Sequence, residues 1–279
     1  MKPRYPRPRK RFGQNFLYDP AIAGRIADAA RVRAGHTVLE LGPGRGILTD
    51  ALVARGAHVI AVEIDTDLAD VLAARYAEDE VTVVRADLVE TSPAGLLGAH
   101  GVSGCILVGN IPYYLTREVL FRYLVDGRDV LEHAVVMMQK EVGERVVAPP
   151  GSRVYGITSV LLQSLYKVSI KLRVASGSFF PKPRVDSVVL GFDPRENPLV
   201  APGEFESFRW LVRGVFAQRR KTIQSTLKSN LGLPGDRVQT ATVDAGVDTH
   251  ARPEQLSVNQ FLALSRAITN AGKGSGGTL

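Results

Sequence analysis

The segment Gly109-Asn110-Ile111-Pro112-Tyr113-Tyr114 combines an amide, a rigid proline and two aromatic rings. The exocyclic N6 of an adenine is a poor nucleophile because its lone pair is delocalised into the ring. The amide oxygen of Asn110 and a nearby backbone carbonyl can accept both N6 hydrogens, which stabilises the charge that develops on this nitrogen during methyl transfer. Tyr113 would stack on the base and hold N6 in line with the methyl group. The segment therefore predicts a site for adenine-N6 methylation; the alternative is a proline-containing turn with a core tyrosine.

A glycine loop upstream, Glu40-Leu-Gly42-Pro-Gly44-Arg-Gly46, predicts a nucleoside cofactor. Glycines allow a positive φ and let a ligand approach the backbone closely. Glu63 ends the next predicted strand, 21 residues after Gly42, where a carboxylate can accept hydrogen bonds from both ribose hydroxyls. The G-x-G-x-G spacing disfavours a dinucleotide, and the absence of a following lysine excludes a P-loop. An ordinary tight strand–helix turn is the alternative.

Acidic side chains surround this loop. They are Glu40, Asp50, Glu63, Asp65 and Asp67. They would repel a phosphate and suit a cation, so we expect S-adenosylmethionine, which carries a sulfonium and no phosphate. Asp87, after the third predicted strand, could accept a hydrogen bond from the exocyclic amine of the cofactor's adenine, or it could simply cap the strand end.

A parallel sheet would bring these segments together. Short β-branched runs bounded by Gly, Asp or Asn predict buried strands at 37–41, 58–64, 81–85 and 105–109. Helical periodicity predicts helices at 47–55 and 67–76. Strand–helix alternation of this kind is typical of right-handed βαβ units. Further strands are predicted at 134–139, 166–174 and 185–192, further helices at 140–147 and 157–165, and an irregular loop at 175–184.

The chain changes character after residue 192. Helical patterns lie near 204–217, 219–230, 236–246 and 257–270, and Ser257 with Gln260 predicts a capping box. We therefore expect a basic arm at 1–19, an α/β catalytic domain at 20–192, a linker at 193–203, a helical RNA-binding domain at 204–270 and a disordered tail at 271–279.

Composition and charge exclude several classes of protein. No apolar run among the 279 residues approaches a membrane span or a secretory signal, which favours a cytoplasmic protein. Cys105 is the single cysteine and there are five histidines, so neither a disulfide framework nor a metal site is expected.

The charge is divided along the chain. Six Lys/Arg and no acid lie in residues 1–12, whereas eleven Asp/Glu against four Arg give residues 37–110 a net charge of −7. Acid-free basic stretches follow at 145–185 and 209–228. This division favours a separate surface for a polyanion over ordinary solvated helix faces.

Several motifs together resemble one family. They are Lys10–Leu17, Glu40–Gly46, Asn110–Tyr113, Gln139–Glu141, Phe179–Ser187 and Gln218–Thr222. Over residues 8–270 the chain resembles the small-subunit (16S) ribosomal RNA adenine N6,N6-dimethyltransferases, the family often identified by kasugamycin resistance when it is lost. The resemblance implies a Rossmann-like methyltransferase domain with a small C-terminal helical domain. It also implies S-adenosylmethionine-dependent dimethylation of two adjacent adenosines in a hairpin loop near the 3′ end of 16S rRNA, within the 30S subunit or its precursor, and allows an added role in 30S assembly.

The resemblance also assigns roles to residues. The cofactor would contact Asn15, Leu17, Gly42, Gly44, Glu63, Asp87 and Asn110. The target adenine would be held by Asn110, Pro112 and Tyr113, with Phe179 stacked on its other face and Phe180 as the fallback. From the basic segments, and not from the resemblance, we further expect the phosphates of rRNA to contact Arg9, Lys10, Arg11, Arg219, Arg220 and Lys221.

The motifs depart from the family at two positions. Ile111 stands where leucine is usual, and Tyr114 stands where asparagine is frequent, which would change a pocket wall.

The alternatives are the related 23S rRNA adenine N6-methyltransferase that confers macrolide resistance, and a non-catalytic nucleic-acid-binding factor on the same fold. DNA adenine methylases are disfavoured because they typically have Asp at the position of Asn110. We expect a monomer that acts on rRNA and does not bind membranes.

Overall fold

The computed structural model describes residues 5–273, and the chain forms two units. Met1–Gly143 with Val168–Asp193 form the first, called the α/β unit, and Glu144–Lys167 with Pro194–Leu279 form the second, the helical unit. This division differs from the uninterrupted catalytic domain expected at 20–192. Residues 144–167 belong with the helical unit because α7 (Ile157–Leu165) packs on α8 (Phe205–Phe216) and α11 (Val258–Lys273). Tyr155 also meets Phe216 edge to face, with ring centroids 6.3 Å apart.

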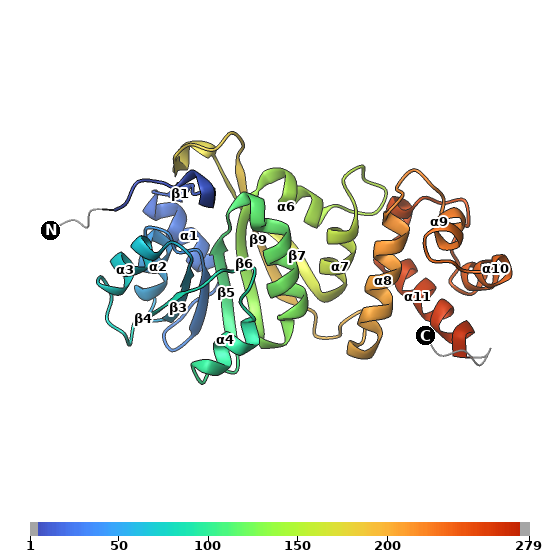
Figure 1. The fold of residues 1–279 in the computed structure, drawn as a ribbon, viewed down its shortest axis with the longest axis horizontal. Coiled ribbons are helices and arrows are strands. Elements are labelled where there is room, and N and C mark those ends of the chain that lie inside the picture. The colour runs from blue at the N-terminus through green and yellow to red at the C-terminus, as the bar shows by residue number, and fades with distance from the viewer. Residues whose placement is uncertain (1–4, 274–279) are drawn as a thin grey trace. The chain divides into compact units, whose positions relative to one another are not determined.

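A seven-stranded sheet with the order β4-β3-β2-β5-β6-β9-β7 forms the centre of the α/β unit (Figure 1). Its strands are β2 (Thr37–Leu41), β3 (His58–Glu63), β4 (Val81–Arg85), β5 (Cys105–Asn110), β6 (Leu131–Gln139), β7 (Tyr166–Val174) and β9 (Ser187–Pro194). The strands from β4 to β6 pair in parallel, and β9 runs antiparallel to β6. The predicted parallel βαβ arrangement and the α/β fold class are thus confirmed. The strand ends differ from those predicted by at most three residues.

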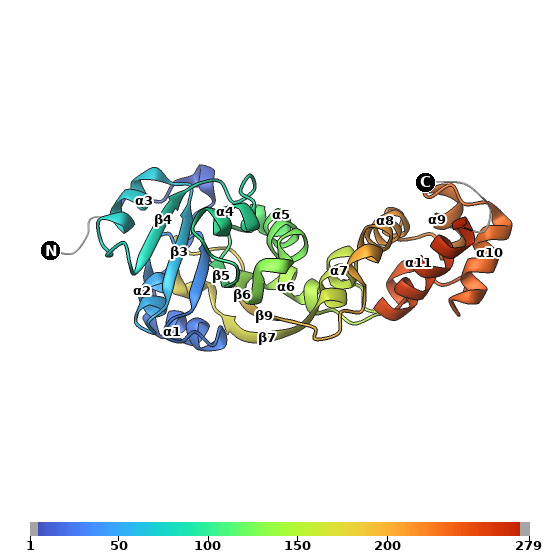
Figure 2. The same cartoon turned by 90° about the horizontal axis from the view of Figure 1, so that it is seen from below.

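Helices cover both faces of this sheet. They are α1 (Pro20–Ala29), α2 (Ile47–Val53), α3 (Thr66–Ala73), α4 (Pro93–Ala99) and α5 (Thr116–Val119), which continues as a π-helix at Leu120–Asp126. A further helix, α6 (Lys140–Val147), begins in the α/β unit and ends in the helical unit. Figure 2 shows α1 and α2 on one side of the sheet and α4 and α5 on the other. Central strands covered on both faces need apolar side chains at consecutive positions, and β3 and β5 are accordingly buried at five of their six residues.

Single turns of 3-10 helix lie between these elements. In the α/β unit they are Lys10–Phe12, Tyr113–Leu115, Arg128–Val130 and Ser176–Ser178, and in the helical unit Pro202–Glu204 and Pro253–Gln255.

A second, two-stranded sheet joins the N-terminal segment to the loop predicted at 175–184. β1 (Phe16–Leu17) pairs antiparallel with β8 (Phe179–Phe180), with Phe16 opposite Phe180 and Leu17 opposite Phe179. The expectation of an irregular loop was therefore wrong at these two residues. Successive side chains of a strand point to opposite faces, so this register decides which of the two phenylalanines is buried.

The helical unit contains α7, α8, α9 (Ile223–Ser229), α10 (Gly235–Asp244) and α11. The predicted capping box is confirmed: the Ser257 N–H donates to Gln260 Oε1 at 2.9 Å, and the Gln260 N–H donates to Ser257 Oγ at 3.2 Å. α11 extends to Lys273, into the predicted tail, and the remainder of that tail lies outside the described residues. β9 likewise takes up the first two residues of the predicted linker.

Within residues 5–273, no helix has the length and apolarity that a membrane span requires. The same residues contain no group of His, Cys, Asp or Glu side chains arranged to hold a metal ion.

Candidate active site

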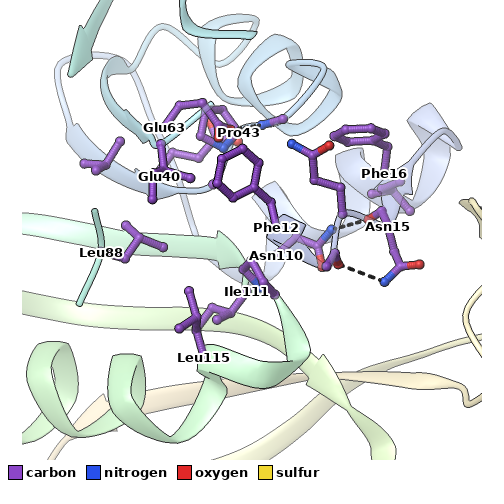
Figure 3. A pocket seen from close by; sticks show the side chains of 18 of the residues that line it. Phe12, Asn15, Phe16, Glu40, Pro43, Glu63, Leu88, Asn110, Ile111 and Leu115 are labelled. Carbon is purple, nitrogen blue, oxygen red and sulfur yellow. Dashed lines mark hydrogen bonds between the residues drawn. The ribbon is translucent and has the colours of Figure 1, made fainter. Parts of the chain in front are cut away.

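One pocket in the α/β unit, at the carboxyl ends of β2, β3 and β5, collects most of the predicted site residues (Figure 3). The predicted residues that line it are Asn15, Leu17, Gly42, Gly44, Glu63, Asp87, Asn110, Pro112 and Tyr113. These residues come from separate segments of the chain. The parallel sheet brings most of the segments to one edge, and the N-terminal segment 12–17 completes the wall.

The glycine loop and Glu63 form one hydrogen-bonded unit. Glu63 Oε2 accepts the Gly44 N–H at 3.1 Å, and Oε1 accepts the Asp65 N–H at 2.9 Å. Gly44 has φ +58°, and a Cβ there would lie 2.9 Å from the Phe16 ring, so this position requires glycine. Glu63 is 6% exposed, and burial raises its pKa against the opposing effect of these two N–H donors. Its carboxyl group is thus fixed in direction before any ligand arrives.

Glu40 is a second buried carboxyl in the pocket wall. Its Oε2 accepts a hydrogen bond from Thr49 Oγ1 at 2.7 Å, whereas Oε1 is buried and has no partner among the described residues. Burial raises the pKa of Glu40 to about 8, and the neighbouring Glu63 adds to the effect. The sequence indicated Glu40 only as one of several acids near the loop. The raised pKa and the unpartnered Oε1 of Glu40 depend on its complete burial, which the neighbouring residues in the sequence do not reveal.

The amide of Asn110 is oriented by the N-terminal segment. Asn110 Nδ2 donates to the Asn15 carbonyl at 3.3 Å, and Asn15 Nδ2 donates to the Gly13 carbonyl at 3.2 Å (Figure 3). A backbone carbonyl can only accept, so this contact assigns the nitrogen to the Asn15 side. The oxygen of Asn110 is therefore left as an acceptor for another group.

Tyr113 is held at its far end. Its hydroxyl shares a hydrogen bond of 2.9 Å with Ser187 Oγ, and Ser187 is 1% exposed. Burial raises the pKa of Tyr113, so the phenol stays neutral. The ring is thus anchored through β9 beside Pro112, which begins the short helical turn Tyr113–Leu115.

Asp87 forms the cap that was one of its two predicted roles, and the contact with the cofactor's adenine stays a prediction. Its Oδ1 accepts the Val89 N–H at 2.8 Å and so caps the turn after β4. The same residue lines the pocket.

Phe179 does not reach the pocket. Its side chain is 3% exposed and belongs to the core of the α/β unit, because its position in β8, opposite Leu17, points it inward. Phe180, the fallback, is 55% exposed. The assignment of Phe179 as a residue that stacks on the target is therefore corrected.

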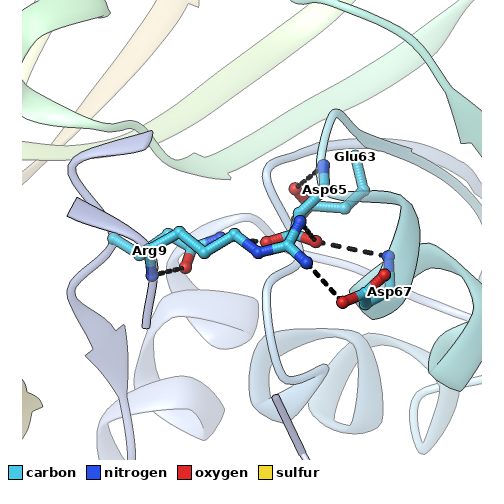
Figure 4. Close-up of polar contacts among 5 residues, drawn as sticks. Arg9, Glu63, Asp65 and Asp67 are labelled. Carbon is cyan, nitrogen blue, oxygen red and sulfur yellow. Dashed lines mark hydrogen bonds and ion pairs between the residues drawn. The ribbon is translucent and has the colours of Figure 1, made fainter. Parts of the chain in front are cut away.

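Arg9, predicted to bind RNA, pairs instead with two carboxylates (Figure 4). Its Nη1 lies 3.0 Å from Asp65 Oδ1, and its Nη2 pairs with Asp67. Gln14 supports the same contact, since its Nε2 donates to Asp65 Oδ2 at 2.9 Å while its Oε1 accepts the Arg9 N–H at 2.7 Å. Asp65 in turn donates its N–H to Glu63. Arg9 thus joins the N-terminal segment to the start of α3, next to Glu63.

The other predicted RNA contacts differ among themselves. Arg11 is exposed, with its guanidinium 4.6 Å from the Phe12 ring centroid; the side chain of Lys10 lies outside the described residues. In the helical unit, Arg219 donates to the carbonyls of Arg153 and Tyr155, both at 2.9 Å. Arg220 and Lys221 are exposed.

Glu40 gives a pH-dependent prediction. Because its pKa is raised in the folded chain, its stabilising contribution is complete below the unfolded pKa near 4.5 and is lost as the pH rises through about 8. An amide cannot ionise. We expect the free energy of unfolding of Glu40→Gln, relative to wild type, to rise between pH 5 and pH 9 by on the order of a few kcal/mol. Urea denaturation measures this difference, and Glu90→Gln, at an exposed glutamate, is the matched control. A constant difference across this range would contradict the raised pKa.

Arg9 and Arg7 give a matched pair. Arg9→Ala leaves Asp65, which is 1% exposed, without its cation, so we expect it to lower the free energy of unfolding by about 1–3 kcal/mol. Arg7 is exposed and has no acidic partner among the described residues, so Arg7→Ala should stay within about 0.5 kcal/mol of wild type. Equal effects of the two variants in chemical denaturation would show that the pair does not hold the segment.

Comparison with known proteins places the chain in a family. A family model described as ribosomal RNA adenine dimethylase matches residues 6–270. The chain is 43% identical to "Ribosomal RNA small subunit methyltransferase A" of Geobacter metallireducens, over 95% of this chain and 97% of that protein. It is 42% identical to the protein of the same name from Anaeromyxobacter dehalogenans, over 96% of this chain and 100% of that protein.

Two solved structures resemble the chain over most of its length. A dimethyladenosine transferase from Plasmodium falciparum has a TM-score of 0.78 and 26% identity, over 92% of this chain and 98% of that one. The 23S rRNA methyltransferase ErmE has a TM-score of 0.70 and 28% identity, over 91% and 100%. With the family model matched almost from end to end, the chain belongs to the ribosomal RNA adenine dimethylase family.

Proposed function

We propose that the chain transfers methyl groups from S-adenosylmethionine to N6 of two adjacent adenosines in a hairpin loop near the 3′ end of 16S rRNA, in the 30S subunit or its precursor. The observation that carries this proposal is the amide of Asn110, whose nitrogen is held by the Asn15 carbonyl at the edge of a pocket that also contains Glu63 and the glycine loop. The names of the curated relatives support the small ribosomal subunit as substrate.

The pocket fits this cofactor. The described residues that line the pocket include three carboxyl side chains, Glu40, Glu63 and Asp87, and one basic side chain, Arg45. Its other titratable side chains are tyrosines. An excess of carboxyls suits a sulfonium and an ammonium group and would repel a phosphate. The buried, unpartnered Oε1 of Glu40 is an acceptor that a cationic ligand would satisfy.

Each part of the cofactor has candidate contacts. Glu63 would accept hydrogen bonds from the ribose hydroxyls, and Asp87 Oδ2 would accept one from the exocyclic amine of the cofactor's adenine. The backbone at Gly42 and Gly44 would lie against the ligand. Asn15 and Leu17 would close the site from the N-terminal segment. When bound, S-adenosylmethionine supplies the electrophilic methyl group.

The target adenine would be activated by position and by hydrogen bonding. Asn110 Oδ1 accepts an N6 hydrogen, Tyr113 stacks on the ring, and Pro112 holds the turn between them. These contacts would stabilise the positive charge that N6 acquires as its bond to the methyl carbon forms and the carbon–sulfur bond breaks. N6 would then lose a proton to solvent. The adenine must leave its base stack to reach Asn110, as base-modifying enzymes generally require.

Exposed basic side chains would contact the phosphates of the RNA backbone. Arg220 and Lys221 are the best placed in the helical unit, because neither side chain is used in a hydrogen bond among the described residues. Arg11 is exposed in the N-terminal segment. Lys10 remains a prediction from the sequence.

The related large-subunit activity is the second candidate, since ErmE shares the fold. Mass mapping of methyl groups on under-methylated 30S particles and, in parallel, on 50S particles, each incubated with the protein and labelled cofactor, separates the two. We expect two neighbouring dimethylated adenosines near the 3′ end of 16S rRNA. Label in 23S rRNA of 50S particles, and none in 30S, would assign the chain to the large-subunit activity.

Asn110 gives the sharpest variant in the same assay. Asn110→Ala removes the acceptor for the N6 hydrogen, and we expect kcat to fall by about 10²–10³. Asn259→Ala, at an exposed position of α11, is the matched control and should leave kcat unchanged. Turnover of Asn110→Ala at the wild-type rate would refute the proposed role of the amide.

The phosphate contacts predict a change in salt dependence. In the double variant Arg220→Ala/Lys221→Ala, the slope of log affinity for rRNA against log salt should become shallower by about 0.7–0.9 for each phosphate that no longer meets a cation. Arg219 is left intact because it also holds the carbonyls of Arg153 and Tyr155. Arg25→Ala, at an exposed position of α1, serves as the control. An unchanged slope in the double variant would show that these bases do not contact phosphates.

A further inference from the structure

A second hollow of about 630 Å³ adjoins the active-site pocket in the α/β unit. The two share Gly13, Gln14, Asn15 and Arg45 in their walls. On its far side the second hollow is lined by Tyr5–Arg9, Phe180 and Pro181. The two hollows are therefore neighbours along residues 13–15 and at Arg45.

The charge of the hollow is of one sign. Among the described residues, its walls contain three arginines, Arg7, Arg9 and Arg45, and no acid. Arg9 is neutralised by Asp65 and Asp67. Arg7 and Arg45 have no acidic partner within residues 5–273. Positive charge without a counter-ion in a concave site favours an anionic ligand.

Arg45 is held by aromatic rings in place of carboxylates. Its guanidinium carbon lies 4.7 Å from the ring centroid of Phe16, 5.5 Å from that of Tyr5 and 5.9 Å from that of Phe180. Its Nε is buried and has no hydrogen-bond partner among the described residues. Cation–π contacts fix a guanidinium without cancelling its charge. Arg45 thus presents a positioned cation whose charge is still available to a ligand.

Phe180 supplies an exposed ring beside this cation. Its backbone is held by pairing with Phe16, so the ring points away from the core that Phe179 enters. At 55% exposure, much of Phe180 is accessible to a ligand. Aromatic rings next to unpaired arginines are typical of sites for single-stranded nucleic acid, in which bases stack on the rings and phosphates lie near the cations.

We propose that this hollow binds the nucleotide next to the target adenosine in the same RNA strand, with its base stacked on Phe180 and its phosphate near Arg45. The proposal rests on the proposed function and adds to it a second base subsite. Moving an adenosine into the active-site pocket removes the stacking partner of its neighbour, and the ring of Phe180 replaces that partner. Two adjacent adenosines are each other's neighbours, so one enzyme site would hold the pair during each transfer.

The position of Phe180 favours the neighbour over the target itself. Asn110 and Tyr113 line the active-site pocket, whereas Phe180 lines only the second hollow. The two assignments can be told apart by removing one base from the RNA. If Phe180 stacks on the neighbouring base, replacing Phe180 has no effect once that base is missing; if Phe180 stacks on the target, the effect remains.

The test combines enzyme variants with RNA that lacks one base. Small subunits are reconstituted with 16S rRNA that carries an abasic nucleotide in place of one or the other of the two adenosines, and kcat/KM is measured for methylation of the adenosine that remains. The full-length variants are Phe180→Leu, which keeps bulk without a ring face, and Phe180→Tyr, which keeps the ring. The dissociation constant of S-adenosylmethionine is measured for each variant.

We expect Phe180→Leu to lower kcat/KM about tenfold on intact subunits, within the range of one stacked base, and Phe180→Tyr to restore it. In at least one of the two abasic subunits, kcat/KM of the wild type should also be about tenfold lower than on intact subunits. In that same subunit, kcat/KM of Phe180→Leu should equal that of the wild type. Cofactor affinity should be unchanged in both variants. A full additional loss in both abasic subunits would assign Phe180 to the target base and overturn the subsite, as would wild-type activity of Phe180→Leu on intact subunits.

Failure of the proposed function is a separate outcome. If the wild type methylates no adenosine in intact reconstituted subunits, the function falls and the subsite falls with it. If the wild type is active and the effects of Phe180→Leu and of the missing base are additive, only the subsite is rejected.

Arg45 provides an independent variant. Arg45→Met keeps much of the length of the side chain but removes the charge, so the slope of log affinity for rRNA against log salt should become shallower by about 0.7–0.9. Arg45→Lys should keep the wild-type slope. An unchanged slope in Arg45→Met would show that this cation does not meet a phosphate.

Discussion

The hydrogen bond from Asn110 Nδ2 to the Asn15 carbonyl is the contact on which the site depends. It joins the end of β5 to a segment 95 residues earlier and sets which end of the amide faces the substrate. An asparagine without this partner can rotate its amide by a half-turn, and the rotated state would present donors to an amine that needs an acceptor. The N-terminal segment is therefore part of the proposed catalytic site.

That segment is itself held from its other end. Arg9 pairs with Asp65 and Asp67, and Gln14 bonds both Arg9 and Asp65. Asp65 in turn donates its N–H to Glu63. A continuous set of polar contacts thus runs from the segment that orients Asn110 to the carboxyl that would bind the ribose. A ligand that engages Glu63 would therefore act on the same contacts that hold the N-terminal segment.

The same region buries three acidic side chains away from water. Glu40, Glu63 and Asp65 are each at most 6% exposed, and among these three only Asp65 pairs with a cation. Burial raises the pKa of Glu40 and Glu63, which is a cost to the folded chain at neutral pH. A cationic ligand would offset that cost. Burial of the carboxyl groups would then account both for the free-energy cost in the ligand-free pocket and for its affinity for a cation.

Much of this arrangement could be predicted from the sequence. The apolar runs of β2 and β5 and the glycines after β2 have local signatures, and parallel strands bring their carboxyl ends to one edge. The choice between Phe179 and Phe180 could not be predicted, because it depends on a two-residue pairing with Phe16 and Leu17. Charge counting placed Arg9 among the RNA contacts because a count cannot show the distant carboxylates that it meets. Residues 144–167 were misplaced for a similar reason, since the helices on which they pack lie much later in the chain.

The most direct test is a high-resolution crystal structure with an adenosine-containing RNA and the demethylated cofactor bound. We expect Asn110 Oδ1 within about 2.7–3.2 Å of the adenine N6, while Nδ2 still donates to the Asn15 carbonyl. An amide turned away from the base, or one that has exchanged its contact with Asn15 for another partner, would contradict the central role of this hydrogen bond.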